Sequence, residues 1–105
     1  MYVIRRVAHT KPGKEWEAAA LLTKICAAYE ANGRNKAQIY SGRGLPGDQH
    51  VVYAEWTQAT IEPNRFPNIP KSVGEDNRKL QELLTSYDLE FFELVTPEKL
   101  QERGL

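Results

Sequence analysis

Cysteine, histidine and net charge are all scarce in this chain of 105 residues. It contains one cysteine and two histidines, and its fourteen Lys and Arg residues balance its fourteen Asp and Glu residues. A single cysteine excludes an internal disulfide bond and a thiolate cluster for zinc. A neutral chain without a basic stripe gives no electrostatic reason to expect binding to nucleic acid or to an anionic membrane.

Long apolar runs are missing as well. The N-terminal segment MYVIRRVAHT has too short an apolar stretch for a signal peptide, and no later stretch is long enough to cross a bilayer. We therefore expect a cytoplasmic protein with no membrane partner. Cys26 stands beside Ile25 on the flank of an expected helix, which predicts an inert packing thiol rather than a nucleophile.

The pattern of apolar residues predicts four strands and two main helices. β-branched runs indicate the strands, helical spacing indicates the helices, and Gly and Pro mark the turns. Asn32 and Gly33 should end the first helix, and Ser72 with Glu75 should form a capping box at the start of the second. We expect strands over residues 2–10, 37–42, 50–57 and 88–95, helices over 14–32 and 72–87, and a short helix or tail over 97–105.

This order predicts one α+β domain over residues 1–105, with a ferredoxin-like β-α-β-β-α-β antiparallel sheet, strand order 4-1-3-2, and both helices on one face. The strands at 50–57 and 88–95 carry apolar side chains on both faces. An antiparallel sheet with one solvated face should instead alternate apolar and polar residues. The second face therefore needs a cover, and we expect a homodimer in which a second copy supplies it through a two-fold interface.

Three stretches carry a family resemblance: TKPGKEWEA at 10–18, VVYAEW at 51–56 and EFFELV at 90–95. Together they resemble the dimeric α+β barrel superfamily, and within it the NIPSNAP-like and antibiotic-biosynthesis-monooxygenase-like proteins. The resemblance implies a dimer whose sheets face one another, with a pocket in each subunit between the sheet and the helices. The activities that it implies range from cofactor-free oxygenation of aromatic polyketides to heme degradation, cyclisation and isomerisation, and many members have no known activity.

Heme degradation does not fit these residues. The related heme-degrading enzymes are similar to this chain at Trp56, but they use an axial histidine from the second helical region and an asparagine on the first strand. Residues 63–87 contain no histidine, and aligning the turn glycine on Gly13 puts Arg6 where the asparagine would stand. A heme without an axial side chain is implausible, and we expect no cofactor.

Trp56 is a candidate for the pocket, because the resemblance places a tryptophan near the end of this strand with its ring toward the cavity. An indole offers a wide apolar wall and one N–H donor, which suits a flat aromatic ligand. The alternative is an ordinary core residue. If Trp56 faces the pocket, alternation puts His50 on the same face and turns Tyr53 and Glu55 toward the dimer interior.

Three further residues complete the expected substrate-binding set. Asn77 interrupts the apolar face of the second helix, and an amide in such a place needs a hydrogen-bond partner. Tyr29 approaches from the first helix, and Arg6, if it points into the pocket, would hold a carboxylate, phenolate or enolate. The connection that carries Arg65 and Phe66 is the natural lid.

His50 is the candidate catalyst, as a general base, because an imidazole titrates near neutral pH. The topology brings His9 and His50 to one end of the sheet, close to Asp88, where a divalent metal or an acid/base set is conceivable. Regular pairing places the two histidines on opposite faces, however, so we expect no metal site. The alternative is two histidines at the rim of the sheet, bonded to solvent and loop.

Arg5 and Arg6 point to opposite faces of the first strand, which the strand order makes central. A partly buried guanidinium requires an acidic partner. For Arg5 we expect an ion pair with Glu55 and with Glu90 or Glu93, which lie on the two neighbouring strands.

The function that follows is binding of a small aromatic or carboxylated metabolite, one in each subunit. If the protein is an enzyme, cofactor-free chemistry of a monooxygenase, cyclase or isomerase type would begin with proton abstraction by His50. Arg6 or Asn77 would then stabilise the oxyanion, and Trp56 would stack on the substrate. The alternative is a non-catalytic ligand-binding or stress-associated module of the same fold.

Overall fold

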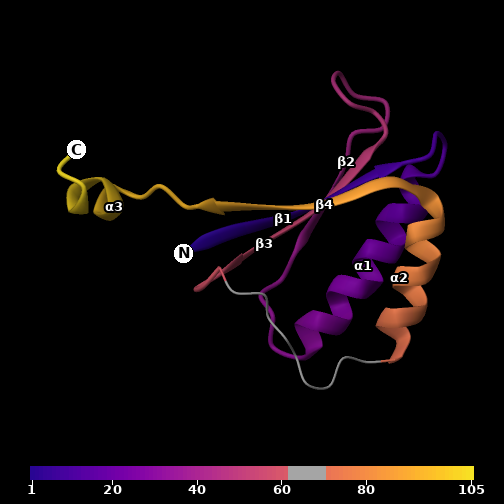
Figure 1. The fold of residues 1–105 in the computed structure, drawn as a ribbon, viewed down its shortest axis with the longest axis horizontal. Coiled ribbons are helices and arrows are strands. Elements are labelled where there is room, and N and C mark those ends of the chain that lie inside the picture. Colours follow the sequence, from indigo (N-terminus) through magenta and orange to yellow (C-terminus); the bar gives the residue numbers. More distant parts are fainter. Residues whose placement is uncertain (62–70) are drawn as a thin grey trace.

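The computed structural model describes residues 1–61 and 71–105. Its elements are β1 (Tyr2–Thr10), α1 (Glu15–Ala31), β2 (Gln38–Ser41), β3 (Val51–Gln58), α2 (Lys71–Leu83), β4 (Leu84–Glu93) and α3 (Pro97–Glu102). The four strands form one antiparallel sheet in the order β2-β3-β1-β4, with β1 and β3 at its centre (Figure 1). This is the predicted order read from the other edge, so the predicted fold class is confirmed.

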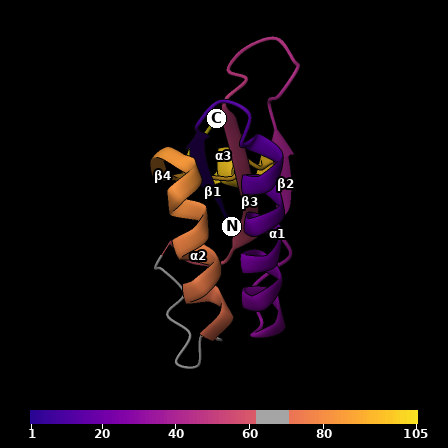
Figure 2. The ribbon, with the colours of Figure 1, turned by 90° about the vertical axis from the view of Figure 1, so that its right-hand side faces the viewer.

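The helices α1 and α2 lie side by side against one face of the sheet (Figure 2). Each fully buried aliphatic side chain between the two layers contributes about 1.5–3 kcal/mol to folding, so this core fixes the backbone that carries the site. Neither helix, nor α3, is long and apolar enough to cross a membrane. The buried core comprises Ile4, Ala8, Ala18, Ala19, Leu22, Ile25, Cys26, Ala37, Val52, Ala54, Trp56, Val73, Leu80 and Leu84.

Successive residues of β1 point to opposite faces of the sheet. Ile4 pairs with Trp56 of β3, and both are buried on the side that the helices cover, here called the inner face. Arg6 stands two residues further along and shares this face. Arg5, paired in register with Glu55, points to the outer face. The predicted separation of the two arginines is therefore confirmed.

The junction between α2 and β4 differs from the prediction. The helix was expected to run to Tyr87 and the strand to begin at Asp88, but the strand begins at Leu84. Leu84 and Tyr87 fit the helical spacing of α2 as well as a strand. Their pairing with Thr10 and Ala8 of β1 decides the outcome, because tertiary contacts override a weak local preference.

The other helix boundaries lie close to the predicted ones. Gly33 has a φ of 102°, a conformation that favours glycine, and it ends α1 as expected. Its backbone N–H donates to the carbonyl of Glu30 at 3.0 Å. The helix α2 begins at Lys71, so Ser72 lies inside the first turn and not at the capping position that we expected for it.

The C-terminal arm, residues 94–105, extends away from the sheet beyond the end of β4 (Figure 1). Its helix α3 is capped by the Thr96 hydroxyl, which accepts a hydrogen bond from the backbone N–H of Lys99 at 3.2 Å. Lys99 also forms ion pairs with Glu93 at 3.1 Å and Glu102 at 3.5 Å. The arm is thus locally ordered, although its aliphatic side chains Leu94, Val95, Leu100 and Leu105 are exposed.

Candidate functional site

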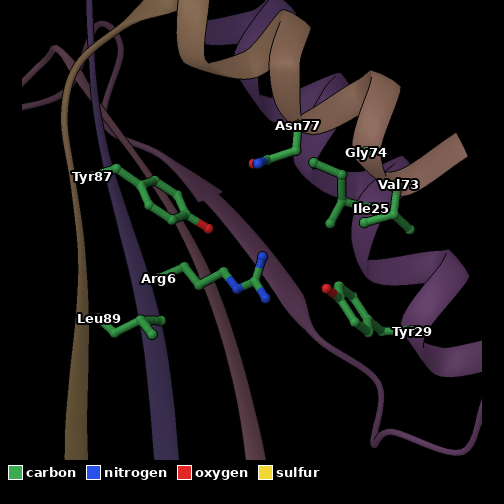
Figure 3. Close-up of a pocket in the computed structure, with 8 residues that line it drawn as sticks. All are labelled: Arg6, Ile25, Tyr29, Val73, Gly74, Asn77, Tyr87 and Leu89. Carbon is green, nitrogen blue, oxygen red and sulfur yellow. The ribbon is translucent and has the colours of Figure 1, made fainter. Parts of the chain in front are cut away.

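A pocket of about 400 Å³ lies between the inner face of the sheet and the two main helices (Figure 3). Strands β1 and β4 form one wall, and α1 and α2 form the other. Its volume is within the usual range of small-molecule sites. The residues that line it are Arg6, Ile25, Tyr29, Val73, Gly74, Asn77, Tyr87 and Leu89.

Arg6 supplies the positive charge of this pocket. Its guanidinium carbon lies 5.4 Å from the ring centre of Tyr29 and 5.4 Å from that of Trp56. Figure 3 shows the guanidinium reaching across the cavity between Tyr87 and Tyr29. The Nε atom is buried and has no hydrogen-bond partner, and no ion pair among the described residues includes Arg6. Contacts with aromatic rings replace only part of the hydration that a guanidinium loses on burial.

Tyr87 presents a second unpaired donor to the same cavity. Its hydroxyl is buried, and among residues 1–61 and 71–105 no partner lies within hydrogen-bond distance of it. Burial raises the pKa of this phenol above its ordinary value of 10.0, and the nearby charge of Arg6 opposes that rise. The hydroxyl is therefore protonated at neutral pH and is available as a donor. The sequence predicts Tyr87 at the end of a helix and indicates no role for it in binding.

Arg34 is a second buried cation that the sequence reasoning missed. It follows Gly33 in the loop after α1, and it is only 6 % exposed. Its guanidinium carbon lies 4.0 Å from the ring centre of Trp56 and 5.0 Å from that of Tyr29. Both Nε and Nη2 are buried without a hydrogen-bond partner. Nothing in a loop arginine after a glycine predicts this burial, because such a position is usually solvated.

Trp56 belongs to the core and is not among the residues that line the pocket. Its indole N–H donates to the side-chain oxygen of Gln58 at 3.0 Å, and the guanidinium groups of Arg6 and Arg34 contact its ring. The ligand-stacking role of Trp56 stays a prediction. Tyr29 is the aromatic residue of the predicted set that lines the cavity directly, and Trp56 contacts Arg6 and Arg34.

Asn77 lines the pocket from α2, and its amide points into the cavity (Figure 3). The residue is exposed overall, so water at the pocket mouth can satisfy the amide. The structure thus brings Arg6, Tyr29 and Asn77 of the predicted substrate-binding set together around one cavity. The predicted lid residues Arg65 and Phe66 lie outside the described residues.

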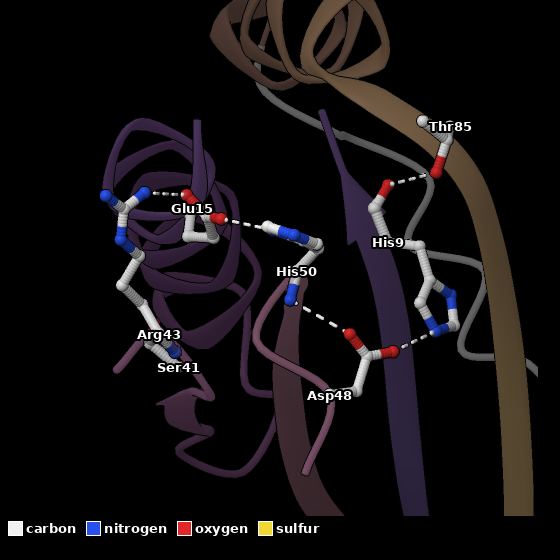
Figure 4. Close-up of polar contacts among 7 residues, drawn as sticks. All are labelled: His9, Glu15, Ser41, Arg43, Asp48, His50 and Thr85. Atoms are coloured by element: carbon white, nitrogen blue, oxygen red, sulfur yellow. Dashed lines mark hydrogen bonds and ion pairs between the residues drawn. The ribbon is translucent and has the colours of Figure 1, made fainter. Parts of the chain in front are cut away.

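His50, the predicted catalytic base, does not line the pocket. It stands just before β3 and directs its Nδ1 to the carboxylate of Glu15, 2.8 Å away, as Figure 4 shows. Arg43 donates to the same carboxylate at 2.8 Å, and Glu15 is fully buried in the first turn of α1. The hydrogen bond from His50 lowers the pKa of Glu15 from 4.5 to about 2, with help from its own backbone N–H and from Arg43, while burial opposes the change. This group is a clamp that fastens the β2–β3 loop to α1.

Comparison with known proteins was made at the levels of sequence and structure. No family model and no curated protein sequence matches the chain. Solved structures do match. A NIPSNAP domain protein from Burkholderia xenovorans has a TM-score of 0.64 and 11 % identity over 92 % of this chain and 97 % of its own. A NIPSNAP family protein from Agrobacterium tumefaciens has a TM-score of 0.57 and 17 % identity over 91 % and 93 %. An antibiotic biosynthesis monooxygenase has a TM-score of 0.59 and 9 % identity over 91 % and 100 %.

The chain has the NIPSNAP and antibiotic-monooxygenase fold. The resemblance given by TKPGKEWEA, VVYAEW and EFFELV is therefore confirmed at the level of the fold. Identities of 9–17 % establish nothing about chemistry, which must be argued from the residues present.

The two histidines lie at one end of the sheet on opposite faces, as predicted (Figure 4). Asp48 links them: it contacts His9 Nε2 at 3.3 Å and accepts a hydrogen bond from the backbone N–H of His50 at 2.9 Å. The other ring nitrogen of His9 lies 3.1 Å from the hydroxyl of Ser86. Asp88 pairs in register with Val7 and not with His9. Within residues 1–61 and 71–105, no three His, Cys, Asp or Glu side chains are grouped to hold a metal.

The outer face of the sheet carries an ion-pair ladder centred on Arg5. Its Nη2 lies 2.9 Å from Glu55 on β3, and its Nη1 lies 3.7 Å from Glu90 on β4. The guanidinium also contacts the rings of Tyr53 and Phe92, with its carbon 5.3 Å and 5.5 Å from the ring centres. The predicted pairing of Arg5 with both neighbouring strands is confirmed.

Proposed function

We propose that this protein binds a small organic anion, a carboxylate or an enolate, in the pocket between sheet and helices. The observation that carries the proposal is the presence of two buried donors without acceptors in one cavity, Arg6 Nε and the Tyr87 hydroxyl. An anionic oxygen seated there would accept from both. Hydrogen bonds that involve a charged partner are about twice as strong as neutral ones. An anionic ligand therefore gains most binding free energy where the protein donors have already lost their hydration.

The lining also bears on the shape of the ligand. Tyr29 offers an aromatic face, and Ile25, Val73 and Leu89 offer aliphatic surface. Asn77 adds an amide that can accept or donate. A compact compound with a flat or aliphatic skeleton and one anionic group fits this combination of an apolar wall and few polar groups.

Binding is favoured over catalysis because the described lining contains no His, Asp or Glu. Such a pocket can stabilise an oxyanion, but it lacks the side chains that most often remove a proton. Cofactor-free oxygenation, cyclisation or isomerisation is the second candidate, since the pair of Arg6 and Tyr87 is suited to an enolate formed in such reactions. We place it second because His50, our expected base, is engaged by Glu15 at 2.8 Å.

Titration calorimetry with benzoate as the probe tests the proposal. We expect saturable binding that weakens at least tenfold in Arg6→Gln, because one charge-assisted hydrogen bond is worth about 1.5–3 kcal/mol. The matched control is Arg78→Gln, which makes the same change at an exposed position on α2. Equal affinity in wild type and Arg6→Gln would contradict the proposed site.

A second variant separates the pocket from general attraction of anions to the surface. Gly74 lines the cavity, and a Cβ atom at this position would meet nothing within 4 Å. Gly74→Leu should therefore fold and place its side chain at the cavity, blocking benzoate without changing any charge. Gly74→Ala is the control, with a small side chain at the same site. Unchanged binding in Gly74→Leu would show that benzoate binds elsewhere.

We also propose that the protein acts as a homodimer through the outer face of the sheet. Support comes from Tyr40 and Phe92, which are 42 % and 45 % exposed although they lie on strands, and from the exposed aliphatic arm. Exposed large apolar side chains that share one face of a sheet are typical of interaction sites. Light scattering at micromolar concentration should give twice the chain mass, and Phe92→Glu should halve it. A monomeric wild type at these concentrations would overturn the dimer.

A further inference from the structure

We propose that the ligand of this pocket carries two separate anionic groups, the first held by Arg6 and Tyr87 and the second by Arg34. The inference deepens the proposed function and rests on it. It names the ligand class as a small dianion, such as a dicarboxylate on a flat skeleton, and it gives Arg34 a specificity role that was not expected from the sequence.

The first argument is the position of the two cations. Arg6 and Arg34 lie over the same two rings, those of Tyr29 and Trp56, with all four carbon-to-centre distances between 4.0 and 5.4 Å. Two like charges that share the same neighbours repel each other, and low solvent exposure weakens the screening between them. A ligand with two negative charges relieves this repulsion more completely than a ligand with one.

The second argument is that neither cation forms an ion pair with another residue in the described ranges 1–61 and 71–105. The described ion pairs engage Arg5, Arg43, His9, His50, Lys14 and Lys99, but neither Arg6 nor Arg34. Glu30, the acidic residue nearest to Arg34 in the sequence, accepts instead from the backbone N–H of Ala37 at 2.8 Å. Three guanidinium donors thus remain buried and unpaired: Nε of Arg6, and Nε and Nη2 of Arg34.

The third argument distinguishes two anionic groups from one doubly charged group. Arg6 lines the open cavity with Tyr87, whereas Arg34 stands outside that lining, stacked 4.0 Å from the centre of the Trp56 ring. The unpaired donors therefore belong to two guanidinium groups, one that lines the cavity and one outside its lining. Two carboxylates, one for each guanidinium, fit this arrangement better than a single phosphate does.

The test compares benzoate with isophthalate, which has the same ring and one additional carboxylate. Calorimetry on the wild type should show isophthalate binding at least tenfold more tightly than benzoate. In Arg34→Gln this preference should vanish, because isophthalate should lose at least tenfold more affinity than benzoate does. Arg78→Gln again serves as the matched control and should keep the preference.

Three results would overturn the inference. One is equal affinity of the wild type for benzoate and isophthalate. In that case the proposed benzoate site would still stand if Arg6→Gln weakened benzoate binding. Another is an equal loss of affinity for both probes in Arg34→Gln, which would show that Arg34 has a packing role. The third is phenyl phosphate binding as tightly as isophthalate and with the same dependence on Arg34, which would indicate one doubly charged group. Failure of both probes to bind the wild type would overturn the proposed function itself.

Discussion

Arg5 and Arg6 are neighbours in the sequence, but they have opposite surroundings. Arg5 lies on the outer face between two strands that each supply a carboxylate, at 2.9 Å from Glu55 and 3.7 Å from Glu90. Arg6 lies on the inner face among rings, with a buried Nε that has no acceptor. The described residues supply acidic partners to the guanidinium of Arg5 but none to that of Arg6.

The same contrast separates the other buried charges. Glu15, in the first turn of α1, is fully buried and receives hydrogen bonds from His50 and Arg43 of the β2–β3 loop at 2.8 Å each. Arg34, beside the pocket, is nearly as buried and has two unpaired donors. A buried charge that the chain neutralises contributes to structure, whereas one that it leaves unpaired indicates a binding site.

Replacing each of the two neighbouring arginines by methionine tests this contrast most strongly. Arg6→Met should weaken benzoate binding about 100-fold without lowering the free energy of unfolding, because a desolvated cation without a partner is replaced by an apolar side chain. Arg5→Met should leave benzoate binding unchanged. Calorimetry and urea unfolding measure the two effects. A marked loss of stability in Arg6→Met would show that this cation is structural after all.

The pH dependence of stability should reveal the Glu15 clamp. Its pKa is lowered in the folded state, so the unfolded chain binds the proton more readily and the contribution of Glu15 to stability rises with pH. The contribution is complete above the ordinary value of 4.5 and is lost as pH falls to about 2. In Glu15→Gln, melting temperatures should be several degrees lower at pH 7, and the difference from wild type should shrink toward pH 2. A difference that is constant over this range would refute the clamp.

The Tyr87 hydroxyl should contribute less to binding than the charge of Arg6. Tyr87→Phe removes one neutral donor and leaves the ring in place, so benzoate affinity should fall about tenfold. Folding should be unaffected, because no residue in the described part of the chain lies within hydrogen-bond distance of the hydroxyl. Thermal denaturation without ligand provides the control for structure. Unchanged benzoate affinity would remove Tyr87 from the site.

The smallest effect is expected on the outer face. Glu55→Gln weakens the ion pair with Arg5, whose side chain is 37 % exposed, and should cost about 0.5 kcal/mol in the monomeric subunit. Because solvent ions screen such pairs, the difference between wild type and variant should decrease further in 1 M salt. Urea unfolding at two salt concentrations measures it. A loss of several kcal/mol, independent of salt, would mean that this pair is buried in an interface.

Most of the fold was predictable because its signals are local and periodic. β-branched runs located β1 and β3, and helical spacing located α1 to within one residue at each end. The junction between α2 and β4 was not predictable in this way. Leu84 and Tyr87 fit the spacing of a helix as well as that of a strand. Only their pairing with β1 shows that they belong to the strand.

The site was predictable only in part, for a different reason. The sequence predicts that Arg5 and Arg6 point to opposite faces, because strand parity is a property of the sequence, but it leaves open which of them shares the face of Trp56. The register of β1 with β3 places Arg6 on that face. The burial of Arg34 could not be predicted from the sequence, because it depends on how a loop folds over two rings. The position of His50 could not be predicted for the same reason, since its partner Glu15 lies 35 residues away in the chain and on another element.

The junction of α2 and β4 contains no intervening loop, since Leu83 ends the helix and Leu84 begins the strand. The carbonyl of Leu83 accepts a hydrogen bond from the backbone N–H of Lys11 at 2.8 Å, which pins this corner to the end of β1. Because no residue separates the helix from the strand, Asn77 on α2 and Tyr87 on β4 reach the pocket from one continuous stretch of backbone. The distance between these two polar side chains is therefore set by the corner itself and not by a loop of variable length.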